Sequence, residues 1–265
     1  MPATEDGHPT VVTTVDDHGV ATVTISRPEV RNAMDWSVFK GLQAAGERVI
    51  ADDAVGAVVV TGADGTFSSG LDTSLFGARA DSLDDTADEE WIAGLQAAFT
   101  IFEDCPKPTI AVIRGHCLGA GAQLAAACHL RLVAADAQIA IAERRWALVP
   151  DLGGTWRLPR LVGLGRATDW VMTGRTVDAD EALASGFAQA RFSDQDDIDG
   201  WARPLAAAPG ATRRVAALLR DNLGRDRDEA LRAEARAQVA CMAGPDVGEA
   251  VAAAMAGREP RFIGQ

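Results

Sequence analysis

Two glycine-bearing segments could carry chemistry through their backbone, because each follows an apolar run that is typical of a buried strand. The first reads GADGTFSSGLD (62–72). The second reads GHCLGAGAQLAAAC (115–128), and its alanine-rich end carries one amide, Gln123. The first turn of a helix leaves N–H groups unpaired, and the helix dipole there favours negative charge. Two such N–H groups that converge on one carbonyl oxygen form an oxyanion hole, which these two turns therefore suggest.

Three more familiar glycine motifs are absent. A dinucleotide fingerprint GxGxxG that begins at Gly119 would need a glycine at position 124, where the chain has Leu124. The chain contains no GKS or GKT for a phosphate-binding loop. Neither Ser68 nor Ser69 has a glycine two residues to each side, as the nucleophile motif GxSxG requires.

The elements that must position the two turns alternate between strand and helix. Residues 20–25 alternate apolar and polar side chains, which predicts a half-buried strand. Helices are predicted after Asp35, a good N-cap residue, and over 120–128. Continuous apolar runs predict buried strands at 57–61 and 109–113, and residues 129–134, which follow the second helix, are a further candidate strand. This alternation indicates an α/β core.

The composition limits the classes of partner. The formal net charge of −13 argues against non-specific nucleic-acid binding, which needs clustered Lys and Arg. No apolar run approaches the roughly 18 residues that span a membrane. The polar, acidic start MPATEDGHPT does not resemble a signal peptide, so we expect a cytoplasmic protein.

The cysteines and histidines indicate no metal site. The four cysteines show no CxxC pairing, and we expect buried, reduced thiols. The four histidines lack zinc-ligand spacing, and His116 and His129 are expected to be structural. We therefore predict no metal.

Two further stretches bear on domain organisation. The acid-rich segment 77–91 is expected to be a solvated loop, with a mobile cover over a site as the alternative. From about residue 205 the chain is rich in Ala and Arg at helical spacing, which predicts two or three packed helices. We expect a flexible tail over 1–10, a core over 11–204 and a C-terminal helical region over 205–265.

Five motifs occur in an order that resembles the crotonase superfamily, the enoyl-CoA hydratases and isomerases. The motifs are RPEVRNAM (27–34), GTFSSGLD (65–72), GHCLGAGAQLA (115–125), VPDLGGTWRLPRLVG (149–163) and TGRTVDADEALASGF (173–187). The resemblance extends from about Val12 to the C-terminal GREPRFIG. It implies a crotonase-like spiral of ββα units with a C-terminal helical region, assembled as trimers or dimers of trimers. The implied substrate is an acyl-CoA thioester of fatty acid metabolism, with coenzyme A as part of the substrate and no permanently bound cofactor.

The resemblance also implies which residues form the site. The oxyanion hole falls on the backbone N–H groups of Leu71 and Ala120, which would stabilise a thioester enolate. Arg31 is a candidate phosphate contact for CoA, with an ordinary surface arginine as the alternative. The other candidates for CoA binding are Arg27, Ala33, Ser69 and Asp72.

The candidate acid–base residues leave the reaction open. Hydratases of this family use two glutamates, and the first falls on Gln123, which cannot exchange a proton at neutral pH but can orient water or substrate. The second falls on Glu143, where the adjacent Arg144 and Arg145 would keep the carboxylate ionised unless they point elsewhere. Certain family isomerases resemble this chain in having an Asp at the position of Asp151, which is also a good turn residue.

Isomerase-type proton transfer is the first hypothesis, since it needs only one shuttling base and the oxyanion hole. A hydratase (lyase) that uses Glu143 alone, with Gln123 positioning the water, is the second. An acyl-CoA-binding relative without turnover is the third. The identity of the acyl group is expected to depend on the pocket lining, including residues 77–91.

Overall fold

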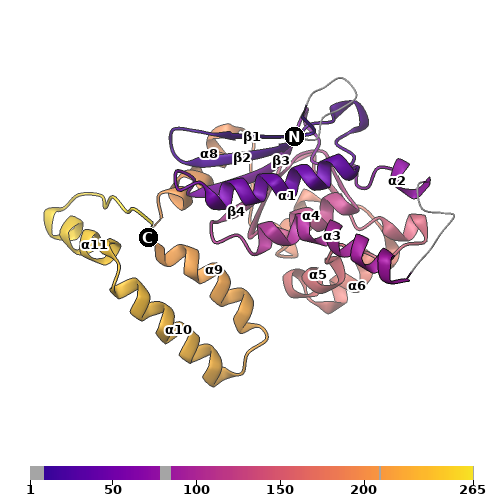
Figure 1. The fold of residues 1–265 in the computed structure, drawn as a ribbon. Coiled ribbons are helices and arrows are strands. Elements are labelled where there is room, and N and C mark those ends of the chain that lie inside the picture. Colours follow the sequence, from indigo (N-terminus) through magenta and orange to yellow (C-terminus); the bar gives the residue numbers. More distant parts are fainter. Residues whose placement is uncertain (1–8, 78–84, 209, 265) are drawn as a thin grey trace.

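The structure is a computed structural model that describes residues 9–77, 85–208 and 210–264, and for residues 76, 77 and 85–87 the backbone alone. Within these residues the strands form two sheets (Figure 1). The larger sheet has the order β1 (Val11–Val15), β2 (Val20–Ile25), β3 (Ala57–Gly62), β4 (Thr109–Ile113), β6 (Leu130–Val133) and β9 (Ala190–Arg191). The smaller has the order β5 (His116–Leu118), β7 (Gln138–Ala140) and β8 (Val177–Asp178).

The helices surround these sheets. Those of the core are α1 (Trp36–Ala51), α2 (Ser74–Gly77), α3 (Asp85–Glu103), α4 (Ala120–Ala127), α5 (Gly154–Val162), α6 (Leu164–Thr173), α7 (Ala179–Ala184) and α8 (Gln195–Ala206). Two short 3₁₀ helices, η1 (Pro28–Val30) and η2 (Glu143–Trp146), lie in the connections. In the larger sheet only the pair β1–β2 is antiparallel, and every other described pair is parallel.

The sheet is buried on both faces where the sequence is continuously apolar. In β3, Val58 and Val60 belong to the main core on the side of α1 and α3, whereas Val59 packs in a second cluster with residues of α8. Strand β2 keeps its predicted alternation: Ala21, Val23 and Ile25 are buried, and the threonines that alternate with them are partly exposed. The predicted strands at 20–25, 57–61, 109–113 and 129–134 are confirmed, because the hydrophobic effect fixes which strand faces are covered.

Local capping also follows the prediction. Helix α1 begins after Asp35, whose Oδ1 accepts a hydrogen bond of 3.0 Å from Val38 N. Helix α4 covers most of the predicted 120–128 and begins after Gly119, whose φ of 50° lies in the left-handed region that favours glycine. The start of α4 is therefore fixed by a glycine turn at the end of β5.

Strands and helices repeat as ββα units. These units wind in a spiral that brings three of the connections between them close together. These connections follow β3, β5 and β7, and they carry residues 66–72, Gly119 with the start of α4, and η2. The α/β fold class and the spiral of ββα units predicted from the motifs are confirmed by this topology. The functional site is built from these three connections.

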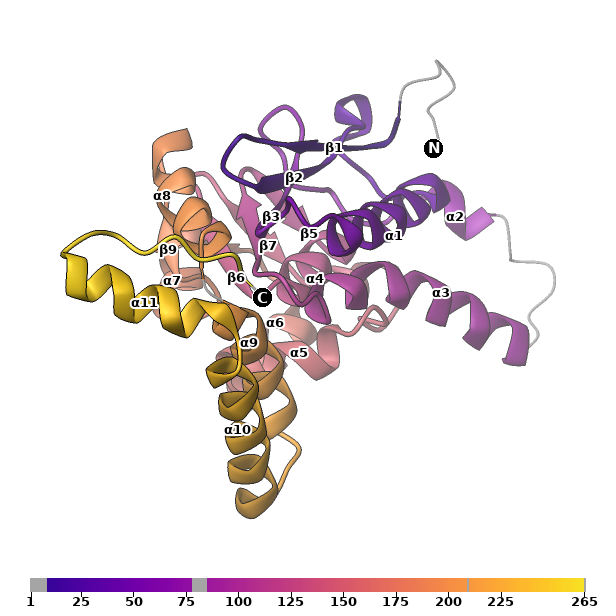
Figure 2. The ribbon, with the colours of Figure 1, turned by 60° about the vertical axis from the view of Figure 1, so that its left-hand side comes forward.

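The C-terminal part is helical, as predicted, with α9 (Gly210–Asn222), α10 (Arg227–Met242) and α11 (Pro245–Ala256). These helices extend away from the sheets, and α9 and α10 pack side by side (Figures 1 and 2). The preceding helix α8 continues to Ala206, slightly past the expected boundary at 205. None of the described helices is by itself long and apolar enough to span a membrane. The pair α10 and α11, bent by 66°, passes that test of length and composition only when taken together.

The expectation of a solvated loop over 77–91 is wrong for its second half. Residues 85–91 are the first turns of α3, and residues 78–84 lie outside the described residues. The run DTADEE resembles a loop by its acidic composition, although it forms the start of an amphipathic helix in which Glu89 and Glu90 are exposed and Trp91 lines a cavity. Of the expected N-terminal tail, residues 1–8 are not described, and Thr10 is buried and accepts a hydrogen bond from Ser26 N.

Candidate active site

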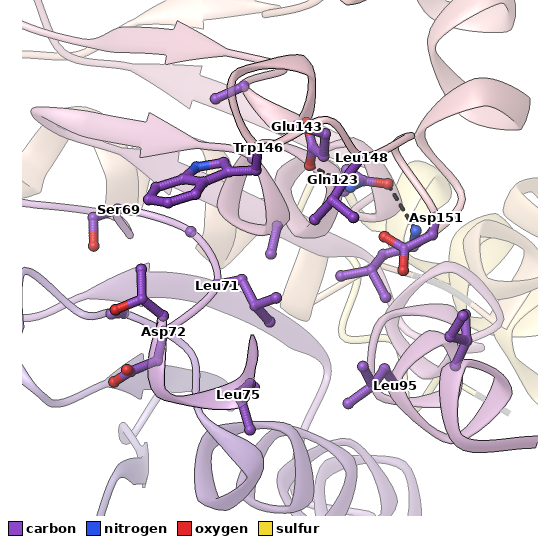
Figure 3. A pocket seen from close by; sticks show the side chains of 18 of the residues that line it. Ser69, Leu71, Asp72, Leu75, Leu95, Gln123, Glu143, Trp146, Leu148 and Asp151 are labelled. Carbon is purple, nitrogen blue, oxygen red and sulfur yellow. Dashed lines mark hydrogen bonds between the residues drawn. The ribbon is translucent and has the colours of Figure 1, made fainter. Parts of the chain in front are cut away.

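A cavity of about 630 Å³ lies where the three connections meet (Figure 3). Its wall is largely apolar and carries a few polar and charged side chains. The apolar side chains that line it include Val30, Leu71, Leu75, Trp91, Ile92, Leu95, Trp146, Leu148 and Leu152. The polar and charged ones include Ser69, Asp72, Asp88, Gln123, Glu143 and Asp151. A concave apolar pocket with a few convergent polar groups is typical of a small-molecule site.

Backbone pairing brings the two glycine segments together. Ser68 N donates to His116 O (2.8 Å), and Leu118 N donates to Ser68 O (3.0 Å), so the two connections run side by side like parallel strands. Gly70 has φ of 100°, and a Cβ at this position would lie 2.8 Å from Leu118 O. The approach of the two turns therefore requires glycine at 70.

Where the two turns meet, the backbone N–H groups of Leu71 and Ala120 can bind a ligand. Both line the cavity. Within the described part of the chain, neither N–H donates a backbone hydrogen bond, and Ala120 N is the first of helix α4. Two unpaired N–H groups beside one cavity are the arrangement that an oxyanion hole needs.

Gln123 lies between the carboxyl groups of Glu143 and Asp151 (Figure 3). It is 1% exposed, and its Nε2 donates to Glu143 Oε1 at 2.6 Å. Its Oε1 accepts from Leu152 N and from Gly154 N, both at 2.9 Å. Gln123 therefore connects Glu143 to the turn that follows Asp151.

Glu143 is the most buried carboxyl group of the cavity wall, with 8% exposure. Its Oε2 has no hydrogen-bond partner among the described residues. Burial raises the pKa of Glu143 and the nearby charge of Asp151 adds to the rise, while the hydrogen bond from Gln123 opposes it. This combination is typical of a proton-transferring carboxyl group.

The two arginines after Glu143 do point elsewhere. Arg144 Nη1 donates to Thr173 O (3.1 Å), and Arg145 Nη2 donates to Gly174 O (2.8 Å). Both guanidinium groups bind carbonyls at the C-terminal end of α6, where the helix dipole favours positive charge. They fasten η2 in place and do not contribute to the shift in the pKa of Glu143.

Asp151 is half-buried and lines the same cavity. Burial raises the pKa of this carboxyl group as well. Its backbone is held from the other side, because Gln96 Nε2 in α3 donates to Asp151 O at 2.6 Å. The structure thus brings Gln123, Glu143 and Asp151 together, as the order of the motifs suggested.

A buried ion pair that the sequence did not reveal supports this turn. Arg157 in α5 is 6% exposed, pairs with Glu103 of α3 at 2.7 Å and donates to Leu152 O at 2.7 Å. Gly153, at φ of 92°, leaves the space that this guanidinium group occupies. Glu103 and Arg157 are 54 residues apart, so no local pattern could have identified the pair.

The candidate residues for CoA binding divide into two groups. Ala33, Ser69 and Asp72 line the cavity, whereas Arg27 and Arg31 are not part of its wall. Arg27 is engaged within the protein, since it pairs with Asp72 at 2.9 Å and also with Asp35. Arg31 is exposed, and its role in CoA binding stays a prediction.

Asn32, for which the sequence made no prediction, holds the segment 27–34 against the first turn. It is completely buried, and its Nδ2 donates to Ala63 O (2.9 Å) and Thr66 O (2.6 Å). Its Oδ1 accepts from Arg27 N. Its φ of 56° lies in the left-handed region, which Asn tolerates better than most residues.

The histidines and cysteines lie apart from this chemistry. His129 is held by Thr109 and by Glu103 O, which agrees with the expected structural role, and burial lowers its pKa. Cys105, Cys117 and Cys128 are buried free thiols. Within residues 9–77, 85–208 and 210–264 no group of three or more His, Cys, Asp or Glu side chains is arranged to hold a metal ion.

Comparison with known proteins places the chain in a family. Residues 16–265 match the family model of enoyl-CoA hydratase/isomerase. The chain is 34% identical over 251 residues to the probable enoyl-CoA hydratase of Rhodobacter capsulatus, a match that covers 93% of this chain and 95% of that protein. It is 37% identical over 204 residues to the mitochondrial Delta(3,5)-Delta(2,4)-dienoyl-CoA isomerase of Mus musculus, with 74% of this chain and 62% of that protein covered.

A solved structure agrees with these matches. The structure of a Thermobifida fusca protein assigned as an enoyl-CoA hydratase, in complex with acetoacetyl-CoA, superposes with a TM-score of 0.81. It is 35% identical, and the match covers 89% of this chain and 95% of that one. Other matched relatives are multifunctional proteins of fatty acid beta-oxidation, of which the chain spans about a quarter, 24% in one case. The chain therefore belongs to the enoyl-CoA hydratase/isomerase family of the crotonase superfamily.

Proposed function

We propose that this protein is an acyl-CoA isomerase that moves a proton between carbons of the acyl chain with Glu143 and Asp151. The observation that carries the proposal is how Gln123, Glu143 and Asp151 are bonded and buried in the cavity wall. Gln123 makes all its described hydrogen bonds to the protein, whereas both carboxyl groups line the cavity with raised pKa values. Carboxyl groups whose pKa is raised by burial suit proton transfer better than exposed ones do.

The substrate class is proposed from the relatives and from the cavity wall. The Thermobifida fusca protein binds acetoacetyl-CoA, and the mouse relative is named for a dienoyl-CoA substrate. In this chain the apolar wall around Leu71, Leu75 and Leu95 would hold the acyl group.

 These three leucines and Trp146 are apolar parts of the cavity wall (Figure 3). The CoA part would pass Ala33, Ser69 and Asp72 at the same wall, with Arg31 near its phosphates.

The proposed reaction uses the oxyanion hole first. The thioester oxygen would accept hydrogen bonds from Leu71 N and Ala120 N, which stabilise the negative charge that develops when a proton leaves C2. A carboxylate takes that proton, and a protonated carboxyl group delivers a proton further along the chain, at C4 for a 3-enoyl or at C6 for a 3,5-dienoyl substrate. The double bonds move towards the thioester, and the overall composition of the substrate does not change.

The test is a panel of 3-enoyl-CoA, 3,5-dienoyl-CoA and 2-enoyl-CoA substrates with the wild type and two variants. We expect migration of double bonds, and we expect Glu143→Gln and Asp151→Asn to lower kcat on the order of 10²-fold or more, since each removes a proton-transfer group. Glu89→Gln, an exposed position on α3 outside the cavity wall, is the matched control and should leave kcat unchanged. Hydration of 2-enoyl-CoA without any migration of double bonds would refute the isomerase.

A hydratase is the second candidate, favoured by the match to the Rhodobacter capsulatus protein over 95% of its length. In that case Glu143 activates a water molecule, and Gln123→Glu would increase hydration. If no substrate of the panel is converted and acyl-CoA still binds in calorimetry, the protein is a binding relative without turnover.

A further inference from the structure

The amide of Gln123 bridges two chain segments that both carry a candidate acid. One is η2, which begins with Glu143, and the other is the turn that leads from Asp151 into α5. Three short hydrogen bonds make the bridge, one to Glu143 Oε1 and two from Leu152 N and Gly154 N. A Cβ at position 154 would lie 2.8 Å from Gln123 Oε1, so glycine at this position admits the amide.

The orientation of this amide is dictated by its neighbours. The carbonyl oxygen must face the two N–H donors, and the NH₂ group must face the carboxylate oxygen of Glu143. A reversed amide would place its donors against two other donors and its oxygen against Glu143. Glutamine has one donor end and one acceptor end at this length, and it satisfies both sides without a charge at every pH.

Because of this bridge, the two carboxylate oxygens of Glu143 differ in their hydrogen bonding. Oε1 is held by Gln123, whereas Oε2 is buried without a hydrogen-bond partner among the described residues. A buried polar atom without a partner is rare and calls for an explanation, such as a role in the reaction. Glu143 lines the cavity, and Oε2 is the carboxylate oxygen that no described protein group binds there.

We propose that Gln123 is a positioning residue, which holds Glu143 by Oε1, directs Oε2 to the reaction and keeps it in register with Asp151. The proposal rests on the proposed function to the extent that Glu143 is the group that reacts. It assigns to Gln123 no proton transfer and no contact with water. Its neutral amide also stabilises the carboxylate of Glu143, which a second carboxylate at position 123 would repel.

Two variants of Gln123 test the proposal. Gln123→Met keeps the length of the side chain but cannot donate, and Gln123→Glu can still accept from Leu152 N and Gly154 N but adds a charge. Gln189→Met is the matched control, because Gln189 also accepts a backbone hydrogen bond, from Arg131 N at 2.7 Å, yet lies outside the cavity wall. Circular dichroism first establishes that each variant is folded. If Gln123→Met fails to fold, Gln123→Glu carries the test.

The first readout does not depend on turnover. The carboxyl carbon of Glu143 is titrated by carbon-13 NMR and assigned by its loss in Glu143→Gln. We expect the pKa of Glu143 to rise in Gln123→Met, where the donor is lost, and to rise further in Gln123→Glu, where a like charge is added. Gln189→Met should titrate as the wild type does. An unchanged titration in both Gln123 variants would overturn the proposal.

The second readout is the rate of the reaction that the wild type catalyses, whichever it is. In Gln123→Met we expect kcat to fall on the order of 10²-fold with KM little changed, because a displacement of about 1 Å at a reacting group has this effect. The pH dependence of kcat should shift upward together with the NMR titration. A Gln123→Glu variant that is faster than the wild type would assign position 123 to acid–base chemistry and overturn the positioning role. A wild type that only hydrates would refute the proposed isomerase and leave this test intact.

Discussion

Glu143 holds its proton more tightly in the folded protein than in the unfolded chain, because burial disfavours the carboxylate. A glutamate in an unfolded chain has a pKa of about 4.3. Between that pH and the raised pKa of the folded state, the native protein binds more protons than the unfolded chain. The free energy of unfolding therefore falls as the pH rises through this window. Glu143 thus makes the native state less stable at neutral pH.

Replacing this carboxyl group should reverse the effect. We expect Glu143→Gln to have a higher melting temperature than the wild type at pH 7, and the difference should vanish below about pH 4, where both states of the wild type are protonated. Melting curves across this pH range check the prediction. Glu249 is a control of opposite sign, since its hydrogen bonds to Arg258 lower its pKa to about 2, so Glu249→Gln should melt lower at pH 7. A Glu143→Gln variant that is less stable than the wild type at every pH would contradict the prediction.

At the scale of secondary-structure elements, the site depends on how α3 and α5 are fastened. The ion pair between Arg157 and Glu103 joins these helices, and Arg157 also holds the carbonyl of Leu152 beside the Gln123 bridge. Both side chains are largely removed from solvent, at 6% and 16% exposure. Removing one partner of such a pair leaves the other charge without compensation.

We expect Arg157→Met to lower the free energy of unfolding by about 3 kcal/mol. The same substitution at Arg160, which is exposed on the same helix, should change it by less than about 0.5 kcal/mol. Urea unfolding followed by fluorescence measures both values. Equal effects at the two positions would show that burial of the Arg157 pair is not what matters. Arg157→Met should also lower kcat, because it loosens the turn that carries Asp151.

For the whole molecule, apolar side chains remain exposed on the C-terminal helices. Leu219 of α9 is 69% exposed, Val239 of α10 is 67% exposed and Met255 of α11 is 86% exposed. Exposed apolar surface of this extent on helices that extend from the core is typical of an interface between subunits. It supports the proposed assembly into trimers or dimers of trimers.

Sedimentation or light scattering should therefore give a mass of three or six times 27.7 kDa. Leu219→Asp and Val239→Asp should shift the mass towards the single chain, because they place a charge in an apolar contact. Arg236→Gln, an exposed polar change on α10, serves as the control and should retain the wild-type mass. A single-chain mass for the wild type at all concentrations would refute the proposed assembly.

The sequence predicted those features in which local physics and burial agree. Val58 to Val60 form a continuous apolar run and lie in a strand buried on both faces, and Asp35 caps α1 as expected. The prediction failed for a helical segment whose composition is mostly polar and acidic. The acidic residues at the start of α3 resemble a loop, although the same helix places Trp91 in the cavity wall.

By itself the sequence determined the family, the order of the motifs and the identity of the three residues at positions 123, 143 and 151. The family and these three residues followed from the resemblance of five ordered motifs, whereas the glycine turns, strand burial and helix caps could be predicted because they are local properties. The tertiary structure decided what those residues do to one another. Gln123 reaches Glu143 across 20 residues and Gly154 across 31, and the arginines beside Glu143 turn away to α6. Such contacts depend on the packing of distant segments, which no pattern along the chain specifies.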